Sequence, residues 1–231
     1  MTASQDLLDF AKNKLKVEFN DINLLDKALT HRSWLNENRR QRGLEHNERL
    51  EFLGDAVLEL VTTEFLHNKY DEAEGILTNW RAALVRTESI GAAAEKLDVW
   101  ETLHLSRGER HGGDRARVQI LANAFEAITG AIYLDQGYDV AKTFIADNIL
   151  VTLDGILKSG SWQDAKSTYQ EKVQAVEGVT PTYKVLDEVG PDHEKVFTVG
   201  VFVVDEQRAA GKGASKQLAQ QAAAEKALQA K

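Results

Sequence analysis

The sequence predicts two domains, an all-α N-terminal domain and a small α+β domain with the order α-β-β-β-α. Both prolines, Pro181 and Pro191, lie in the last quarter of the chain, and the residues before them place apolar side chains at helical spacing. Beyond residue 164 the spacing changes to period two in three segments, which is typical of half-buried strands. We therefore expect a helical domain at 1–158, a linker at 159–163 and the α+β domain at 164–231.

The helical domain is predicted from successive amphipathic segments that are joined by polar connections. The segments cover about 6–15, 22–34, 47–67, 76–84, 87–97, 119–134 and 140–157. The connections "NENRRQRG" and "SRGERHGGDRAR" are rich in glycine and charge, as loops are. The arginines of the second connection are suited to binding an anion, or they are simply solvated.

The second domain begins after "KSGSWQD", residues 158–164, whose small and polar residues indicate a linker. Trp162 is an unusual linker residue and is suited to packing against one of the domains. A helix is predicted over about 165–176, strands over 182–189, 195–205 and 207–213, and a last helix after Ser215, which stands at its N-cap position.

Composition narrows the class of protein. Hydrophobic residues make up 43% of the chain and charged residues 28%, so a packed core is expected and disorder is not. The absence of cysteine excludes disulfide frameworks and zinc–thiolate sites. The N-terminus mixes acids and lysines into its apolar positions, so it predicts neither a signal peptide nor a membrane span. A cytoplasmic protein without a membrane partner is expected.

The stretch "HNERLEFLGD", residues 46–55, carries an unusual set of acids. Glu48, Glu51 and Asp55 are spaced i, i+3 and i+7, so a helix places them on one face. A second predicted helix sets Asn123 and Glu126 three residues apart. Like charges at such spacing repel one another, and either a solvated helix face or a shared cation explains them.

A hard divalent cation is the functional explanation. Glu74 begins a third helical segment, so oxygen-bearing side chains from three segments could meet at one point. Mg²⁺ prefers oxygen ligands, and its charge relieves the repulsion between carboxylates. The net charge of −8 argues against a nucleic-acid binder, but acids that bind metal contribute to that total while serving an anionic substrate.

Several segments resemble the bacterial ribonuclease III family in order and spacing. They are "ALTHRSW", "HNERLEFLGDAVLEL", "EGILTNWRAALV" and "GERHGGDRARVQILANAFEAITGAIYLDQG". The region from "TYQEKVQ" to "GKGASKQLAQQAAAEKAL" resembles a double-stranded-RNA-binding domain. The resemblance implies a homodimeric endoribonuclease that uses Mg²⁺, which Mn²⁺ can replace. It would cut double-stranded RNA to 5′-phosphate and 3′-hydroxyl ends, in the processing of ribosomal and messenger RNA.

The resemblance also assigns roles to residues of the first domain. It implies catalytic roles for Asp55 and Glu126, metal binding by Glu51, Asn123 and Glu126, auxiliary acidic roles for Glu48 and Glu74, and a dimer contact at Phe52, for which an ordinary core position is the alternative. The family most often has Asp where this chain has Asn123. The amide oxygen can still bind a cation but cannot accept a proton. The alternative function is therefore a catalytically weakened protein that binds double-stranded RNA without cutting it.

In the second domain the resemblance implies RNA contacts by Gln170, Glu171, His193, Lys212 and Lys216. From residue 161 onward the sequence has nine Lys and Arg against ten Asp and Glu, a net charge of −1. We therefore expect a modest salt dependence of RNA binding. A third interpretation, a helical structural protein without an RNA role, predicts that duplex RNA is not retained at low salt.

Overall fold

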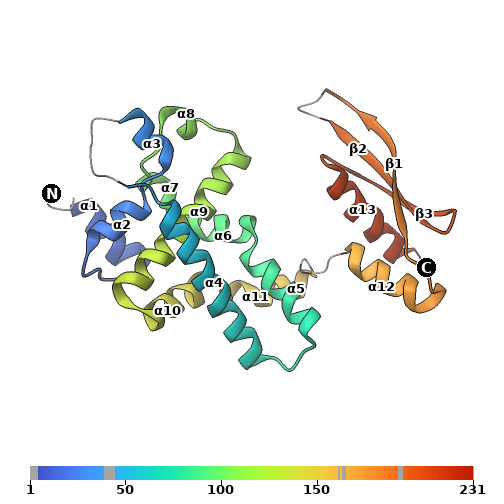
Figure 1. Cartoon of the computed structure of the whole chain (residues 1–231), viewed down its shortest axis with the longest axis horizontal. Helices are drawn as coiled ribbons and strands as arrows, with labels where there is room; N and C mark the ends of the chain where they lie inside the picture. Colours follow the sequence, from blue (N-terminus) through green and yellow to red (C-terminus); the bar gives the residue numbers. More distant parts are fainter. Residues whose placement is uncertain (1–4, 39–44, 161, 163–164, 192–194, 231) are drawn as a thin grey trace. The chain divides into compact units, whose positions relative to one another are not determined.

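The structure, a computed structural model, describes residues 5–38, 45–160, 162, 165–191 and 195–230. The chain forms two compact units, Met1–Trp162 and Gln163–Lys231 (Figure 1). The first is helical and the second has the order α-β-β-β-α, so the predicted fold class is confirmed. Among the described residues, every helix is too short or too polar to cross a lipid bilayer.

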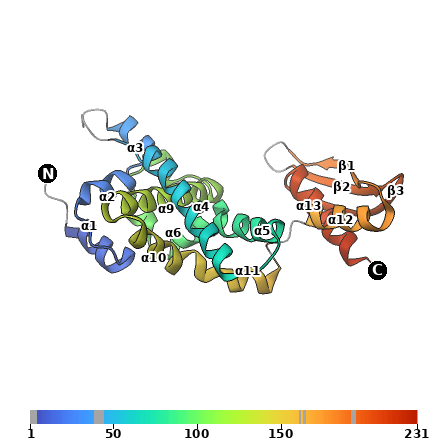
Figure 2. The same ribbon diagram turned by 60° about the horizontal axis from the view of Figure 1, so that its bottom comes forward.

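The first unit is built around two long helices, α4 and α9 (Figures 1 and 2). Its elements are α1 (Gln5–Phe10), the π-helical turn η1 (Ala11–Leu15), α2 (Ile22–Ala28), α3 (Arg32–Glu37), α4 (Glu48–Lys69), α5 (Glu74–Val85), α6 (Thr87–Lys96), α7 (Val99–Thr102), α8 (Arg107–Arg110), α9 (Asp114–Gln136), α10 (Tyr138–Asn148), the 3₁₀ turn η2 (Leu150–Thr152) and α11 (Leu153–Ser159). Helix α9 packs against α2, α4, α6 and α10, and its middle is fully buried.

Two glycines let α4 and α9 touch backbone to backbone. A Cβ atom at Gly54 would overlap the carbonyl oxygen of Glu126, and one at Gly130 would overlap the carbonyl oxygen of Leu50. Only glycine fits at such crossings, because any side chain would force the helices apart. The crossing therefore fixes which residues of α4 lie beside which residues of α9.

The start of α4 is tied to the preceding segment. Asn47 is buried, its Nδ2 donates to the carbonyl of Ala28 at 3.2 Å, and its backbone N–H donates to the carbonyl of Thr30 at 3.0 Å. Because Asn47 is buried and is hydrogen-bonded through both its side chain and its backbone, it holds the start of α4 in one position. The acids of the first turns of α4 thus begin from a fixed anchor.

The structure corrects three of the predicted segments. The helix expected over 22–34 is two helices, because the backbone between them pairs with the backbone of His104. The N–H of His104 donates to the carbonyl of Leu29 at 2.9 Å, and the N–H of His31 donates to the carbonyl of His104 at 3.1 Å. The segment 140–157 breaks into α10, η2 and α11 where the Thr152 hydroxyl and N–H both bond the carbonyl of Ile149.

The third correction concerns "SRGERHGGDRAR", which was expected to be a loop. It contains α8, and α9 begins at Asp114 rather than near residue 119. The Ser106 hydroxyl accepts from the N–H of Glu109 at 3.2 Å and caps α8.

The second unit is a three-stranded antiparallel sheet with two helices on one face (Figure 2). Its elements are α12 (Ala165–Glu177), β1 (Thr182–Val189), β2 (Val196–Val203), β3 (Glu206–Gly213) and α13 (Lys216–Gln229), with strand order β1-β2-β3. Val201 and Val203 pack on the small face of α13 formed by Ala223, Ala224 and Ala227. Ser215 caps α13, as predicted, by accepting from the N–H of Leu218 at 3.2 Å.

Candidate functional site

The acids predicted for the catalytic site meet at the crossing of α4 and α9. Glu51 and Asp55 flank Gly54, whose backbone touches that of Glu126. Burial raises the pKa of Glu126 to about 8, and the charges of Asp55 and then Glu51 act in the same direction. Burial also raises the pKa of Glu51, followed by the charges of Glu48 and Asp55. The carboxylates of the two helices therefore lie close enough to repel one another.

The donor set of this cluster fits a hard divalent cation. Carboxylate and amide oxygens are the ligands that Mg²⁺ prefers. A cation would stabilise the ionised carboxylates of Glu51 and Glu126, which burial and repulsion disfavour here. Within the part of the chain that the structure describes, no three His, Asp or Glu side chains already converge as ready-made ligands. The helices set the backbone positions, and rotation of the side chains would complete a metal site.

Asn123 lies one turn before Glu126 on α9 and is half-buried. Its Oδ1 accepts a hydrogen bond from Nε2 of Gln119 at 2.7 Å. An amide oxygen has two lone pairs, so Oδ1 keeps one of them for a cation or for a bound water. Gln119 was not predicted as a site residue, because nothing in its spacing distinguishes it from an ordinary helix-surface residue.

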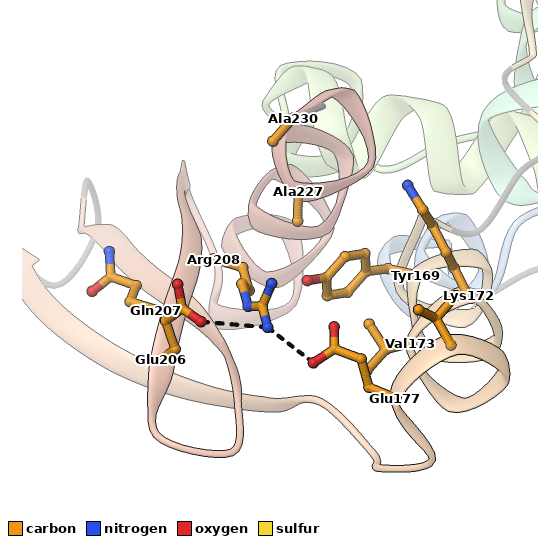
Figure 3. A pocket seen from close by; sticks show the side chains of 10 residues that line it. Tyr169, Lys172, Val173, Glu177, Glu206, Gln207, Arg208, Ala227 and Ala230 are labelled. Atoms are coloured by element: carbon orange, nitrogen blue, oxygen red, sulfur yellow. Dashed lines mark hydrogen bonds and ion pairs between the residues drawn. The ribbon is translucent and has the colours of Figure 1, made fainter.

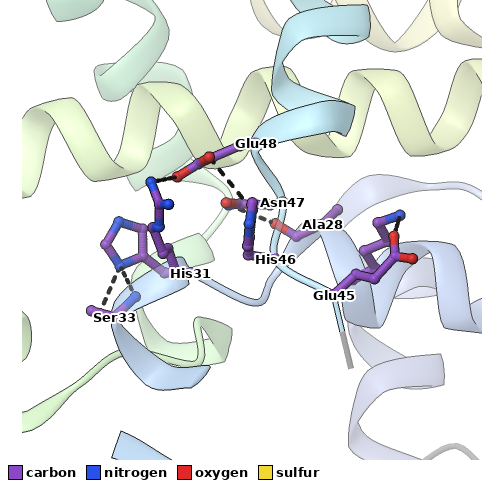
Figure 4. Close-up of polar contacts among 9 residues, drawn as sticks. Ala28, His31, Ser33, Glu45, His46, Asn47 and Glu48 are labelled. Carbon is purple, nitrogen blue, oxygen red and sulfur yellow. Dashed lines mark hydrogen bonds and ion pairs between the residues drawn. The ribbon is translucent and has the colours of Figure 1, made fainter. Parts of the chain in front are cut away.

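Glu48 is held by basic side chains at the start of α4 (Figure 4). Nη1 of Arg32 lies 3.1 Å from its Oε1, and Nδ1 of His46 lies 3.7 Å from its Oε2. Beside them, burial lowers the pKa of His31 against the opposing charges of Glu109 and Glu48. Its Nδ1 accepts from the N–H of Ser33 at 3.3 Å. Arg32 was not predicted from the sequence, because its partner Glu48 is 16 residues away.

Glu74 does not join the other acids within this chain. It stands at the first position of α5, and its carboxylate accepts from the Thr78 hydroxyl at 3.0 Å. It lines a cavity of about 350 Å³ with Thr63, Leu66 and His67. Thr63 lies twelve residues beyond Glu51 on α4, which corresponds to about 18 Å along the helix. The expectation that acids from three segments meet at one point therefore holds for α4 and α9 only.

Phe52 lies on the same turn as Glu51 but points away from the core. Its side chain is 80% exposed, so it is not a core residue. An exposed phenylalanine beside this cluster of acids is an uncommon surface feature that is suited to a contact with another protein surface.

Two of the arginines of "SRGERHGGDRAR" have structural partners within the first unit. The guanidinium of Arg110 donates to the carbonyls of Trp100 and Leu103 at 2.7 and 2.6 Å, and so caps the end of α7. Arg117 pairs with Glu95 at 2.6 Å and lies over the Trp100 ring. Arg107 and Arg115 are exposed and remain candidates for a phosphate contact.

The predicted RNA contacts of the second unit lie on three of its elements. Gln170 and Glu171 are exposed on α12, and Lys212 is exposed near the end of β3. Lys216 is the first residue of α13, where its Nζ lies 3.2 Å from Oε1 of Glu188 and 5.5 Å from the centre of the Phe197 ring. His193 falls outside the described residues.

A cavity of about 330 Å³ lies at the other end of this unit (Figure 3). Arg208 bridges Glu177 of α12 and Glu206 of β3 there, at 2.9 and 3.4 Å. Ala230 lines the cavity and follows Lys216 by fourteen residues, or about 20 Å of helix. The bridge ties α12 to the sheet at the end of α13 that lies away from Lys216.

A helical domain with clustered, partly buried carboxylates, joined to an α-β-β-β-α domain with a lysine at one helix start, is typical of two-domain nucleases that act on RNA. The comparison with known families is specific. A model described as Ribonuclease-III-like matches residues 21–153, and a model of the double-stranded RNA binding motif matches residues 165–231. The chain belongs to the ribonuclease III family, whose members are endoribonucleases of double-stranded RNA that typically use Mg²⁺.

The relatives are similar over nearly the whole chain. Ribonuclease 3 of Pelotomaculum thermopropionicum is 43% identical over 229 residues, which is 99% of this chain and 95% of that protein. Ribonuclease 3 of a Roseiflexus species is 41% identical and covers 96% of this chain and 95% of its own length. The nuclease domain of ribonuclease III from Campylobacter jejuni, described with a region involved in dimer formation, is 41% identical with a TM-score of 0.53, over 61% of this chain and 97% of that one.

Proposed function

We propose that the acids at the crossing of α4 and α9 are the active site of this endoribonuclease. Asp55 and Glu126 would act as catalytic residues, and Glu51, Asn123 and Glu126 would hold Mg²⁺, with Mn²⁺ as a substitute. The observation that carries this proposal is the pKa of Glu126, which burial and the charges of Asp55 and Glu51 raise to about 8. Such a perturbed acid beside named charge partners is typical of a functional site.

When bound, the cation would activate a water molecule and neutralise charge on the phosphodiester. The residues of this chain would position the groups that surround the cation. The α4–α9 crossing sets the acids, the bond from Gln119 turns the amide of Asn123, and Arg32 holds Glu48 at the edge of the cluster. Asp55 is exposed, so its carboxylate can orient the attacking water toward the phosphorus. The products would be 5′-phosphate and 3′-hydroxyl ends.

The RNA-binding domain, at 164–231, would recognise the duplex by its shape. The A-form major groove hides the base edges, so contacts go to 2′-hydroxyls and phosphates. Gln170, Glu171 and His193 would face minor-groove hydroxyls. Lys212 and Lys216 would face phosphates, with the free N–H groups at the start of α13 as additional donors. The catalytic domain would cover 1–158, with a linker at 159–163.

We further propose a homodimer that uses the exposed Phe52 as a contact with the partner subunit. Two sites would then lie across one duplex, one for each strand, and would leave short 3′ overhangs. Glu48 would assist as an auxiliary acid at the edge of the cluster. The substrates would be precursors of ribosomal RNA and structured messages, which places the protein in the cytoplasm of a bacterial cell.

A cleavage assay tests this function. Long double-stranded RNA is incubated with the protein and Mg²⁺, with and without a chelator, and Glu126→Gln is the matched variant. The proposal predicts scission only with Mg²⁺, no scission by the variant, and RNA retention by both proteins. RNA binding without scission by the native chain would favour the alternative suggested by Asn123, a non-cleaving binder.

A further inference from the structure

Trp162 lies beyond the last helix of the catalytic unit but is packed onto it. Helix α11 ends at Ser159, and Gly160 closes it in the left-handed conformation with φ of 69°. Trp162 is half-buried against the core of the first unit. Its ring meets that of Trp80 edge to face, with centroids 5.8 Å apart and an interplanar angle of 86°. This is one of the favourable geometries for aromatic pairs.

The surface that receives Trp162 is aromatic and rigid. Trp80 is only 7% exposed, and its ring meets Tyr70 edge to face at 5.1 Å. Tyr70 in turn meets Phe65 of α4 at 6.4 Å. Trp162 therefore ends a row of rings that leads back to the helix carrying Glu51 and Asp55. Linkers are usually small and polar, so a tryptophan seated in this way needs an explanation.

The position of Trp162 determines how many residues join it to the second unit. Only residues 163 and 164 separate it from Ala165, the first residue of α12. Three backbone steps span at most about 10 Å, whereas a tether that began at Gly160 would have five steps and span about 17 Å. The volume within reach of the RNA-binding unit would grow about fivefold, and its effective concentration at the catalytic unit would fall by a similar factor.

We infer that Trp162 anchors the start of the tether to the catalytic unit and thereby limits the range of the RNA-binding unit. It is a positioning residue for duplex RNA, since both units must meet one substrate. Only this last step rests on the proposed function. The anchor itself depends on the ring contacts alone.

The absence of cysteine makes the anchor measurable. Spin labels on Glu88→Cys and Glu225→Cys, one in each unit and both exposed, report the distribution of distances between the units. Labelled chains are diluted with unlabelled chains, so that only distances within one chain are measured. We expect Trp162→Ala to broaden the distribution and Trp162→Phe, which keeps a ring, to leave it near that of the native protein. An unchanged width in Trp162→Ala would overturn the inference.

Cleavage kinetics test the consequence for RNA. Trp162→Ala should raise KM for a long duplex by about fivefold and change kcat by less than about twofold. Insertion of Gly-Ser-Gly after Trp162, which lengthens the tether and keeps the anchor, should raise KM in the same way. A lower melting temperature and lower kcat with an unchanged KM would mean a structural role only and would overturn the inference. If the native chain cuts no RNA, the proposed function fails, and the distance distribution still decides whether the anchor exists.

Discussion

At Glu126, burial and two neighbouring charges act in the same direction. The pKa of this carboxyl is raised from 4.5 to about 8. Between these pH values the folded chain binds a proton that the unfolded chain lacks, so the free energy of unfolding falls as pH rises through this window. The penalty is absent near pH 4.5 and complete above pH 8. A bound cation would offset this penalty, which burial and the charges of Asp55 and Glu51 impose on the ionised carboxylate.

This fall in the free energy of unfolding with rising pH predicts the effect of Glu126→Gln on stability in the presence of a chelator. We expect the variant to have a higher melting temperature than the native protein at pH 8 and nearly the same melting temperature at pH 4, because the uncharged amide removes the cost of burying a charge and the repulsion from Asp55 and Glu51. Thermal unfolding followed by circular dichroism from pH 4 to 9 measures this. A variant that is less stable at pH 8 would show that Glu126 has stabilising partners instead.

Asn123 offers a second residue-level prediction. Asn123→Asp adds a negative charge beside Glu126 and should tighten Mg²⁺ binding, because a carboxylate is a stronger ligand than an amide. The same change should lower the melting temperature in a chelator. Calorimetric titration with Mg²⁺ and a thermal scan measure both. Weaker Mg²⁺ binding in Asn123→Asp would show that the pair with Gln119 is matched to this site.

At the scale of elements, the site depends on how closely α4 and α9 cross. Gly54→Ala would push a methyl group into the carbonyl of Glu126, and we expect a loss of about 3 kcal/mol in the free energy of unfolding. Gly155→Ala is the matched control, because Gly155 is exposed on α11 and a Cβ atom there would meet nothing within 4 Å. That change should be neutral or gain about 0.5–1 kcal/mol. Urea unfolding compares the two, and equal effects would contradict the close crossing.

The long helices and the strands were predictable because their periodicity extends over many residues. The interruptions were not, because tertiary contacts made them: His104 pairs with the backbone between α2 and α3, and Arg110 reaches the carbonyls of Trp100 and Leu103. The face shared by Glu51 and Asp55 follows from helical spacing. Its meeting with Glu126 does not, although an isolated glycine inside each long helix, Gly54 and Gly130, is a signal of close approach.

At the scale of the whole molecule, an acidic chain must bind an acidic polymer. The net charge is −8, and the residues from 161 onward contribute −1 of it. Attraction to RNA therefore comes from the placement of a few lysines. Lys216 is drawn toward Glu188 at 3.2 Å, and Lys195 lies 4.0 Å from the same carboxylate. Glu188 would thus compete with RNA phosphates for both lysines.

We expect Glu188→Gln to tighten binding of duplex RNA by about twofold to fivefold at low salt, the range of an exposed ion pair. Glu225→Gln, an equal change of charge on the exposed side of α13, is the control and should have a smaller effect. Fluorescence anisotropy at several salt concentrations measures both affinities. Equal tightening by the two variants would mean that net charge, rather than competition for Lys216 and Lys195, controls binding.

The central claim is that Glu51, Asn123 and Glu126 hold one divalent cation between α4 and α9, with the charge of Asp55 beside them. The most direct test is titration of Mn²⁺ followed by the electron paramagnetic resonance signal of the free ion. Glu51→Gln, Asp55→Asn and Glu126→Gln should each weaken binding by about tenfold or more. Glu59→Gln, on the same helix but paired with Arg81 at 3.1 Å, should bind as the native chain does. Native affinity in all three cluster variants would contradict the account.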